Sequence, residues 1–506
     1  MRIGLLLLLT LAAVGLRFYR LSNQSLWTDE VASITTARVP LDRMVEASAL
    51  NNSLPTYFLV LRGVIGGSNE NIEFRARAIS ALAGGLSIPV FIAVVFLWRR
   101  HWGAALLAGL LLATNPLHIW YSQEVRAYAL MLFFGLFTLL GYELARRQPK
   151  FGWWAGYVLS ALIAIAFHKT ALVFPVACAL WHGWAIFRER GRWRNLLIHM
   201  TVLAVALLFL MPGSHPPPQE FGRSSSVLEI GYTFMTYVGG YSFGPSLTDI
   251  QSYGALAAVA RHPVQVGILC AVLLLIAAGC WSSFSASIPK LGAPASLPAR
   301  LSSATTPARM PALPVKELSL LLLAVGTVAA GALLSAFPYN IRYTLPGLLA
   351  FLALVAALVT ATSGSWFPRA AIAGLLLTGL WADGQWFFDA DYRKGDSRAV
   401  AEWLVKNEGQ VKSWTVLPDY LGDSINWYLQ GHPEVLSRLQ PAKQANSTSF
   451  PPVPDVLIIG RRHHVLQPDE LIDSYQALAG KSGVIRSFAG FELYVKGRPM
   501  EEPDSR

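Results

Sequence analysis

Two adjacent carboxylates, Asp29 and Glu30, follow the first apolar segment of the chain and lie just beyond Trp27. Partial burial beside an aromatic side chain shifts the pKa of a carboxyl group, and a carboxylate tuned in this way can accept the proton of a hydroxyl group. Asp29 and Glu30 are therefore candidate catalytic residues, and Trp27 is a candidate substrate contact. The alternative is a solvated Asp-Glu pair that begins an interfacial helix, where acidic residues favour the helix dipole.

A second set of polar residues, Glu124, Arg126 and Tyr128, lies where the chain re-enters an apolar segment. Ionisable groups at that depth are costly unless they are paired or functional, and a guanidinium can hold a phosphate by two parallel hydrogen bonds. Arg126 is therefore a candidate phosphate ligand, and Glu124 and Tyr128 are candidate substrate contacts. The alternative is a structural Glu–Arg pair flanked by aromatic side chains at the membrane surface.

Two further turns carry cations. His168 and Lys169 form a short turn between two apolar runs, and Arg342 and Tyr343 lie at the start of a later one. Lys169 alone could simply extend to the lipid headgroups. Three cations at one face of a membrane protein, Arg126 included, predict an anion site, and a lipid phosphate is the natural anion at that depth. His168 and Tyr343 are then candidate substrate contacts.

Metal chemistry receives little support from residue spacing. The three cysteines, Cys178, Cys270 and Cys280, lie within apolar runs and lack the spacing of a zinc site. His118, His168 and the carboxylates are the groups from which a divalent metal site could assemble, but no ligand spacing marks one. We assign no metal ligand and no certain cofactor, and a divalent metal ion stays an open alternative.

The composition places these residues in a membrane protein. Of the 506 residues, 54% are hydrophobic and 14% are charged, whereas a soluble domain is typically about 25% charged. Lys and Arg outnumber Asp and Glu by 41 to 30, but they fall in short clusters between apolar runs. That pattern is typical of orientation in a bilayer rather than of nucleic-acid binding, so the expected partner is the lipid bilayer and not a nucleic acid.

A membrane-spanning helix needs roughly 20 apolar residues, and somewhat fewer where flanking side chains extend to the surface. On this criterion the sequence predicts an α-helical polytopic protein with about eleven spans. They lie near 3–16, 78–98, 102–118, 128–145, 153–167, 170–187, 195–211, 263–281, 318–337, 344–362 and 368–382. The first segment also resembles a secretory signal, and on either interpretation the residues after it lie outside.

The distribution of basic residues predicts which connections face the cytoplasm. Lys and Arg cluster in every second connection, so the long first outer loop, residues 17–77, should lie on the opposite, extracytoplasmic side. An odd number of spans places the C-terminal tail on that side too. We therefore expect a multi-pass protein of the cell (inner) membrane.

Three parts of the chain follow from this organisation. Residues 1–382 form the predicted transmembrane domain, which contains a Ser-, Pro- and Ala-rich cytoplasmic linker at 282–317. Residues 383–506 are polar with mixed charge, and contain an amphipathic helix and short apolar runs. They predict a small extracytoplasmic α/β domain.

Three motifs resemble a known family. Leu26-Trp-Thr-Asp29-Glu30 is similar to the Asp-Glu motif of the glycosyltransferase C superfamily. The closest branch, a family 39-like group, contains the protein O-mannosyltransferases and the lipid A aminoarabinose transferases. Tyr121-Ser-Gln-Glu-Val-Arg-Ala-Tyr128 resembles the second outer loop of that branch, and Arg342-Tyr-Thr-Leu-Pro346 its late Arg-Tyr-x-x-Pro element. The stretch Asn51-Asn-Ser-Leu-Pro55-Thr-Tyr57 lacks the His of the His-Pro-Pro-Leu-Tyr run that many relatives carry there.

The resemblance implies a specific reaction. Sugar nucleotides are not available outside the cytoplasm, so the donor would be a polyprenyl-phosphate sugar. Asp29 would deprotonate the hydroxyl of a protein, lipid or glycan acceptor with support from Glu30, and the hydroxyl would attack with inversion. Arg126, Lys169 and Arg342 would stabilise the departing lipid phosphate. Such a mannosyltransferase-like enzyme would serve protein glycosylation, lipopolysaccharide modification or another cell-envelope process.

The main alternative is a flippase or transporter of polyprenyl-linked glycolipids. Transporters often show internal repeats and charged groups near the bilayer midplane. The two halves of this chain show no repeat, and the ionisable residues singled out above gather at the ends of apolar segments. These features favour the transferase.

Overall fold

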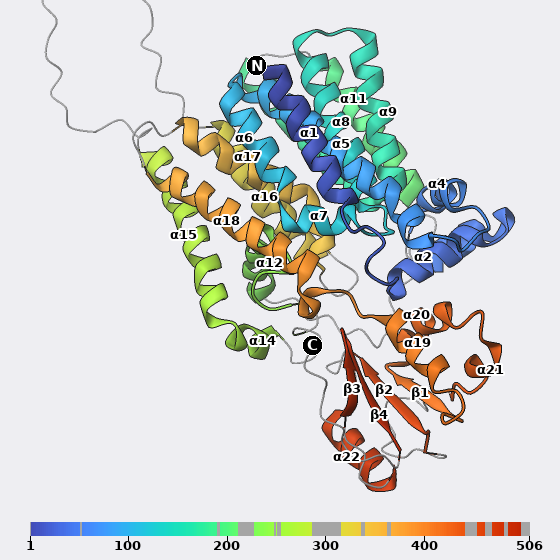
Figure 1. Ribbon diagram of the computed structural model, residues 1–506. Helices are drawn as coiled ribbons and strands as arrows, with labels where there is room; N and C mark the ends of the chain where they lie inside the picture. The colour runs from blue at the N-terminus through green and yellow to red at the C-terminus, as the bar shows by residue number, and fades with distance from the viewer. Residues whose placement is uncertain are drawn as a thin grey trace, which may run out of the picture.

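The computed structural model is predominantly helical, with a small sheet near the C-terminus (Figure 1). It describes residues 2–50, 53–189, 193–210, 227–246, 249, 255–285, 315–334, 340–361, 366–440, 453–460, 468–479 and 484–496. The predicted linker at 282–317 therefore falls mostly outside the described residues. Its first four residues belong to helix α15 and its last three to helix α16, so the predicted boundaries were too wide at both ends.

Every predicted span overlaps an α-helix over most of its described length, although one of them is broken into two helices. The helices are α1 (Arg2–Phe18), α5 (Ile72–Arg99), α6 (Trp102–Ala113), α8 (Tyr128–Arg147), α9 (Phe151–Phe167), α10 (Val173–Glu189), α11 (Arg194–Leu210), α15 (Pro263–Ser285), α16 (Val315–Leu334), α17 (Leu345–Ala361) and α18 (Phe367–Phe388). Among the described residues, four helical stretches are long and apolar enough to cross a membrane alone, and a bent pair makes up to five. The number of crossings, about eleven, stays a prediction.

The bent pair corrects one predicted span. Residues 102–118 were expected to form a single helix, but α6 ends at Ala113 and α7 (Pro116–Ser122) leaves at 59°. The break lies at Asn115-Pro116, where proline disfavours helix in the preceding residue and is well suited to begin a new one. The Asn115 side chain accepts a hydrogen bond from the His118 backbone N–H at 3.0 Å and so caps α7. The loop that carries Glu124 and Arg126 follows α7, so this bend sets the direction in which the loop leaves.

The first outer loop is largely helical. It contains α2 (Thr28–Arg38), η1 (Leu41–Arg43), α3 (Met44–Leu50) and α4 (Pro55–Ile65). Shorter elements connect the later helices: η2 (Lys169–Leu172), α12 (Val227–Gly239), α14 (Ala255–Arg261) and η3 (Ile341–Thr344). In Figure 1 the loop helices α2 and α4 and the C-terminal domain lie at the same end of the bundle, away from the N-terminus.

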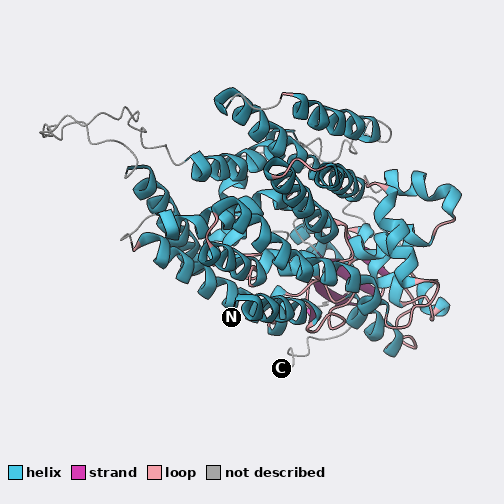
Figure 2. Cartoon of the chain, turned by 90° about the horizontal axis from the view of Figure 1, so that it is seen from above, coloured by secondary structure: helices cyan, strands magenta, loops and turns pink. Residues whose placement is uncertain are grey.

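The C-terminal domain is a four-stranded sheet covered by helices on both faces. The strands β1 (Trp414–Leu417), β2 (Val456–Gly460), β4 (Phe491–Val495) and β3 (Val484–Phe488) are adjacent in that order, with β1 and β2 parallel and the other pairs antiparallel. Its helices are η4 (Ala390–Tyr392), α19 (Ser397–Lys406), η5 (Asp419–Leu421), α20 (Gly422–Tyr428), α21 (Pro433–Leu436) and α22 (Pro468–Ala479). Seen from above, the strands gather in one region (Figure 2).

The strand sequences explain this layering. Successive side chains of a strand point to opposite faces, and in β2 Val456 and Ile458 pack with α19 while Leu457 and Ile459 pack with α22. A strand buried on both faces has a continuous apolar sequence, as β2 does. The predicted fold class, a helical membrane protein with a small C-terminal α/β domain, is confirmed.

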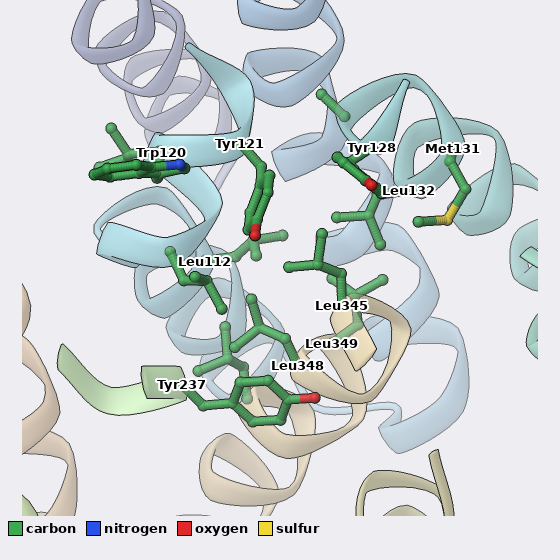
Figure 3. Packing of buried hydrophobic residues seen from close by; sticks show 14 of the residues in the cluster. Leu112, Trp120, Tyr121, Tyr128, Met131, Leu132, Tyr237, Leu345, Leu348 and Leu349 are labelled. Carbon is green, nitrogen blue, oxygen red and sulfur yellow. The ribbon is translucent and has the colours of Figure 1, made fainter. Parts of the chain in front are cut away.

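The largest of the apolar clusters among the described residues lies between the helices. Figure 3 shows part of it, where Trp120 and Tyr121 of α7 lie near Leu112, and Tyr237 lies beside Leu348 and Leu349 of α17. The hydroxyl of Tyr237 donates a hydrogen bond to the backbone oxygen of Thr344 at 2.6 Å. This contact anchors η3, which carries Arg342.

One helix contact depends on the absence of a side chain. A Cβ at Gly141 of α8 would lie 2.9 Å from the backbone nitrogen of Tyr157 in α9, whereas a Cβ at Gly156 would meet nothing within 4 Å. Small residues allow membrane helices to approach closely. Gly141→Ala should therefore lower the unfolding temperature in detergent by an amount equivalent to about 1–3 kcal/mol, as measured by scanning fluorimetry.

Gly156→Ala is the matched control, and it should leave the unfolding temperature unchanged or slightly raised because alanine favours helix. Equal effects of the two substitutions would contradict the close packing of α8 on α9.

Candidate active site

Glu30 is a fully buried anion in the first turn of α2. Its two oxygens accept hydrogen bonds from Nε and Nη2 of Arg77 at 2.8 and 2.6 Å, and Oε1 also accepts one from the Val125 backbone N–H at 3.1 Å. The ammonium of Lys394 lies 3.3 Å from Oε1. Burial alone would raise the pKa of Glu30, but Arg77 and Lys394 outweigh it and lower the pKa to about 2. Glu30 is therefore negatively charged at neutral pH and holds the guanidinium of Arg77 in place. This is compatible with the supporting role predicted for it.

Asp29 points the other way, toward two arginines. Its Oδ2 lies 3.0 Å from Nη1 of Arg342 and 3.2 Å from Nη2 of Arg126, and about a third of its side chain, 32%, is exposed. The three residues come from α2, from the loop between α7 and α8, and from η3. The fold thus brings the predicted base together with two of the three predicted phosphate ligands.

The third predicted phosphate ligand, Lys169, follows the half-buried His168. The His168 ring lies 4.9 Å from that of Tyr128 and stacks with that of Tyr343 at 6.1 Å. Burial, with further contributions from Arg342, Arg126 and Lys169, lowers the pKa of His168 to about 3. The imidazole is therefore neutral at pH 7. All three predicted cations thus lower the pKa of this one ring, although only Arg126 and Arg342 contact Asp29 among the ion pairs of the described residues.

Glu124 lies in a different environment from Glu30. It is 2% exposed, and within the described part of the chain its Oε2 has no hydrogen-bond partner. Burial is the largest cause that raises its pKa, to about 7, and the charges of Glu30 and Asp29 act in the same direction. Lys394 and Arg126 oppose the shift. A group of this kind can gain or lose a proton near neutral pH, so Glu124 is a candidate for proton transfer as well as a predicted substrate contact.

The described residues contain no group of three or more His, Cys, Asp or Glu side chains that could hold a metal ion. His118, which the sequence left as a candidate metal ligand, is buried beside an arginine. Its Nδ1 is 2.7 Å from Nη2 of Arg17, and it faces α1 from α7.

Part of the chain is similar to a known protein family. Residues 55–214 match the family described as dolichyl-phosphate-mannose-protein mannosyltransferase. The resemblance to the glycosyltransferase C superfamily is confirmed. The family match includes Glu124, Arg126 and the His168-Lys169 turn, and it ends well before Arg342.

Two solved structures are also similar to the chain. The structure of ArnT from Cupriavidus metallidurans bound to undecaprenyl phosphate is 13% identical, with 97% of this chain and 98% of that chain covered and a TM-score of 0.47. An oligosaccharyltransferase from Archaeoglobus fulgidus is 12% identical, with 90% and 68% covered and a TM-score of 0.46. No curated protein matches the chain.

Two residues of this candidate site were missed by sequence reasoning. Arg77 lies at the end of the predicted outer loop, and Lys394 follows the last apolar helix. Basic residues are depleted on the outer side of membrane proteins, so an outer arginine beside an apolar run was a usable signal for Arg77. No local pattern distinguished Lys394 from other lysines of the polar C-terminal region. Its role depends on Glu30, which is remote in the sequence.

The loop that carries Glu124 and Arg126 is held from both sides. The Gln123 side-chain amide donates to the backbone oxygens of Arg17 and Tyr19, each at 2.9 Å. Its Oε1 accepts a hydrogen bond from Nε1 of Trp386 in α18 at 2.8 Å. The first and last apolar helices therefore both position this loop.

Glu30 should make stability depend on acidic pH. Because its folded pKa of about 2 lies below its ordinary value of 4.5, its contribution is complete above about pH 4.5 and is lost as the pH falls toward 2, with a total of about 3 kcal/mol. We expect Glu30→Gln to destabilise the protein most at neutral pH, and the difference from the wild type to shrink between pH 4.5 and 3. Thermal unfolding in detergent across this range measures it.

Glu46→Gln, at an exposed position of the same outer loop, is the control and should unfold like the wild type at each pH. A destabilisation by Glu30→Gln that did not change with pH would show that the charge of Glu30 is not what matters.

Proposed function

We propose that this chain transfers a sugar from a polyprenyl-phosphate donor to a hydroxyl group, on the extracytoplasmic face of the membrane and with inversion at the anomeric carbon. The observation that carries the proposal is the contact of Asp29 with both Arg126 and Arg342. The residue proposed as proton acceptor and two residues proposed as phosphate ligands come from three distant parts of the chain and are in contact.

The site suits a lipid phosphate. Arginines at the ends of apolar helices can reach a phosphate at headgroup depth while the polyprenyl chain stays in the lipid. The matched family takes its name from a dolichyl-phosphate sugar, which is a donor of this class. The neutral His168 and the rings of Tyr128 and Tyr343 line the same cluster, and they would contact the sugar or the phosphate.

The proposed reaction begins with proton removal. Asp29 accepts the proton of the acceptor hydroxyl, and the oxygen attacks the anomeric carbon as the bond from that carbon to the phosphate oxygen breaks. The electron pair of the broken bond leaves with the polyprenyl phosphate, whose charge Arg126, Arg342 and Lys169 stabilise. In the absence of donor, Asp29 itself neutralises the two arginines. A bound phosphate would compete for them, and Asp29 would then be available for the acceptor.

Transfer by purified protein in lipid vesicles tests the function. The donors are a panel of radiolabelled polyprenyl-phosphate sugars, and a cell-envelope extract supplies the acceptor. Label that becomes covalently attached to an acceptor supports the transferase. Label that crosses the bilayer with its lipid linkage intact would instead show a flippase.

Asp29→Asn should reduce the transfer rate by about 10²- to 10⁴-fold, the usual contribution of a general base. Asp42→Asn, at an exposed position of the same loop, keeps the change of charge and should transfer at the wild-type rate. Retention of activity in Asp29→Asn would reject Asp29 as the base, and Glu124 would become the candidate for that role.

Arg342→Met should weaken donor binding. Loss of a charge-assisted hydrogen bond costs about 1.5–3 kcal/mol, or roughly 10- to 150-fold in affinity. Binding of radiolabelled polyprenyl phosphate to protein in nanodiscs measures the effect, and Arg43→Met, exposed in η1, is the matched control. Unchanged affinity in Arg342→Met would place the donor phosphate elsewhere.

A further inference from the structure

Two buried groups of opposite charge meet near one oxygen of Glu30. This oxygen, Oε1, accepts hydrogen bonds from Nε of Arg77 and from the Val125 backbone N–H, and Nζ of Lys394 lies 3.3 Å from it. Val125 directly follows Glu124, so the loop that carries Glu124 is bound to the same atom that Lys394 contacts. Lys394 and Glu124 are therefore neighbours in the fold, although they are far apart in the sequence.

The ammonium of Lys394 has more N–H donors than partners. Its side chain is 3% exposed, and over the described residues Nζ has no acceptor in hydrogen-bond geometry. The rings of Trp27 and Trp120, with centroids 5.6 and 5.7 Å from Nζ, attract the cation through their faces only. Glu30 already receives hydrogen bonds from Arg77 at both of its oxygens. Because unused donors on a buried ammonium are costly, a further acceptor is expected.

The carboxyl group of Glu124 has the complementary deficit, because its buried Oε2 has no donor within the described part of the chain. The ionisable groups whose charges interact with it come from α2, α4, α7, α8 and the segments after α7, α12 and η4, and they are Asp29, Glu30, Tyr57, Tyr121, Arg126, Tyr128, Tyr241 and Lys394. Arg126 and Lys394 are the cations of this set, and Arg126 is already paired with Asp29 at 3.2 Å. Lys394 is therefore the cation of the set with N–H donors left for Glu124.

The backbone of Lys394 is tied to the turn before α2. Its N–H donates to Oε1 of Gln24 at 3.1 Å, and the backbone oxygen of the next residue, Gly395, accepts a hydrogen bond from the Ser25 hydroxyl at 2.9 Å. Arg77 donates to the backbone oxygens of Gln24 and Ser25 as well. One turn therefore fixes the positions of both Arg77 and Lys394, although they precede and follow the greater part of the helical bundle in the sequence.

We propose that Lys394 is a positioning residue that acts through Glu124: its ammonium binds the charged carboxylate of Glu124 and holds a second proton acceptor near Asp29. The role in the reaction rests on the proposed function. Arg126, two residues after Glu124, contacts Asp29. The proton that Asp29 takes from the acceptor hydroxyl must leave before the next turnover, and the charged form of Glu124 can accept it. Lys394 favours that form, since its charge lowers the pKa of Glu124 against the larger effect of burial.

Infrared titration of the full chain in nanodiscs tests the proposal without requiring transfer. The carbonyl stretch of a protonated carboxyl group reports on Glu124, and the band is assigned by its loss in Glu124→Gln. In the wild type the band should disappear as the pH rises, with a midpoint near the pKa of about 7. A nearby opposite charge lowers a carboxyl pKa by about 1–3 units, so Lys394→Met should raise the midpoint by about one unit or more. Lys394→Arg keeps the charge and should titrate close to the wild type, and so should Lys412→Met, at an exposed position of the same domain.

An unchanged midpoint in Lys394→Met would overturn the proposal. Lys394→Gln, which keeps a hydrogen-bond donor without the charge, gives the same comparison if Lys394→Met fails to fold. A loss of polyprenyl-phosphate binding in Lys394→Met as large as that in Arg342→Met would also overturn it, because Lys394 would then be a phosphate ligand.

The transfer rate is a separate measurement, and its decline at low pH should move upward by the same amount as the infrared midpoint. An infrared shift in a protein that shows no transfer activity would reject the transferase and keep the pairing of Lys394 with Glu124. An infrared shift without any change in the pH dependence of an active enzyme would keep the transferase and reject the role of Lys394 in the reaction.

Discussion

The ion pair of Glu30 with Arg77 is the interaction on which the site depends. Besides both oxygens of Glu30, the guanidinium of Arg77 donates to the backbone oxygens of Leu21, Gln24 and Ser25. The buried side chain of Arg77 therefore stabilises the turn after α1 and holds the start of α2 in place. Removing two charges from water is expensive, and only a geometry that satisfies all of their hydrogen-bonding groups compensates the cost. Here that geometry also decides where Asp29 points.

The same ion pair explains why two buried glutamates differ. Glu30 and Glu124 are both withdrawn from water, yet the pKa of the first is lowered to about 2 and that of the second is raised to about 7. Arg77 contacts Glu30 directly, whereas Glu124 has one oxygen without a partner among the described residues. Neighbouring carboxyl groups with separated pKa values are a common arrangement in enzymes, since one stays charged and the other can exchange a proton. Glu30 and Glu124 are the same type of residue, and their pKa values differ because their partners differ.

Much of this architecture is accessible from the sequence, and the part that is not has a physical reason. Hydropathy is local, so each predicted span overlaps a helix, although the span at 102–118 is broken into α6 and α7. The apolar runs of the C-terminal region match β1, β2 and the β3–β4 pair. Motifs at the ends of apolar segments identified Asp29, Arg126 and Arg342, which the fold brings into contact. The partnership of Glu30 with Lys394 joins residues from opposite ends of the chain. No local pattern encodes such a contact, because it arises only when the C-terminal domain packs on the first outer loop.

The position of Asp29 gives the proposed reaction a direction. Arg126 and Arg342 lie where apolar helices end, so a polyprenyl phosphate held there can leave through the lipid without crossing the acceptor. Asp29 is the residue that both arginines contact. In the proposed reaction the acceptor hydroxyl and the departing phosphate lie on opposite sides of the anomeric carbon, as inversion requires. The first turn of α2, held by Glu30 and Arg77, places the proposed base beside the proposed phosphate ligands.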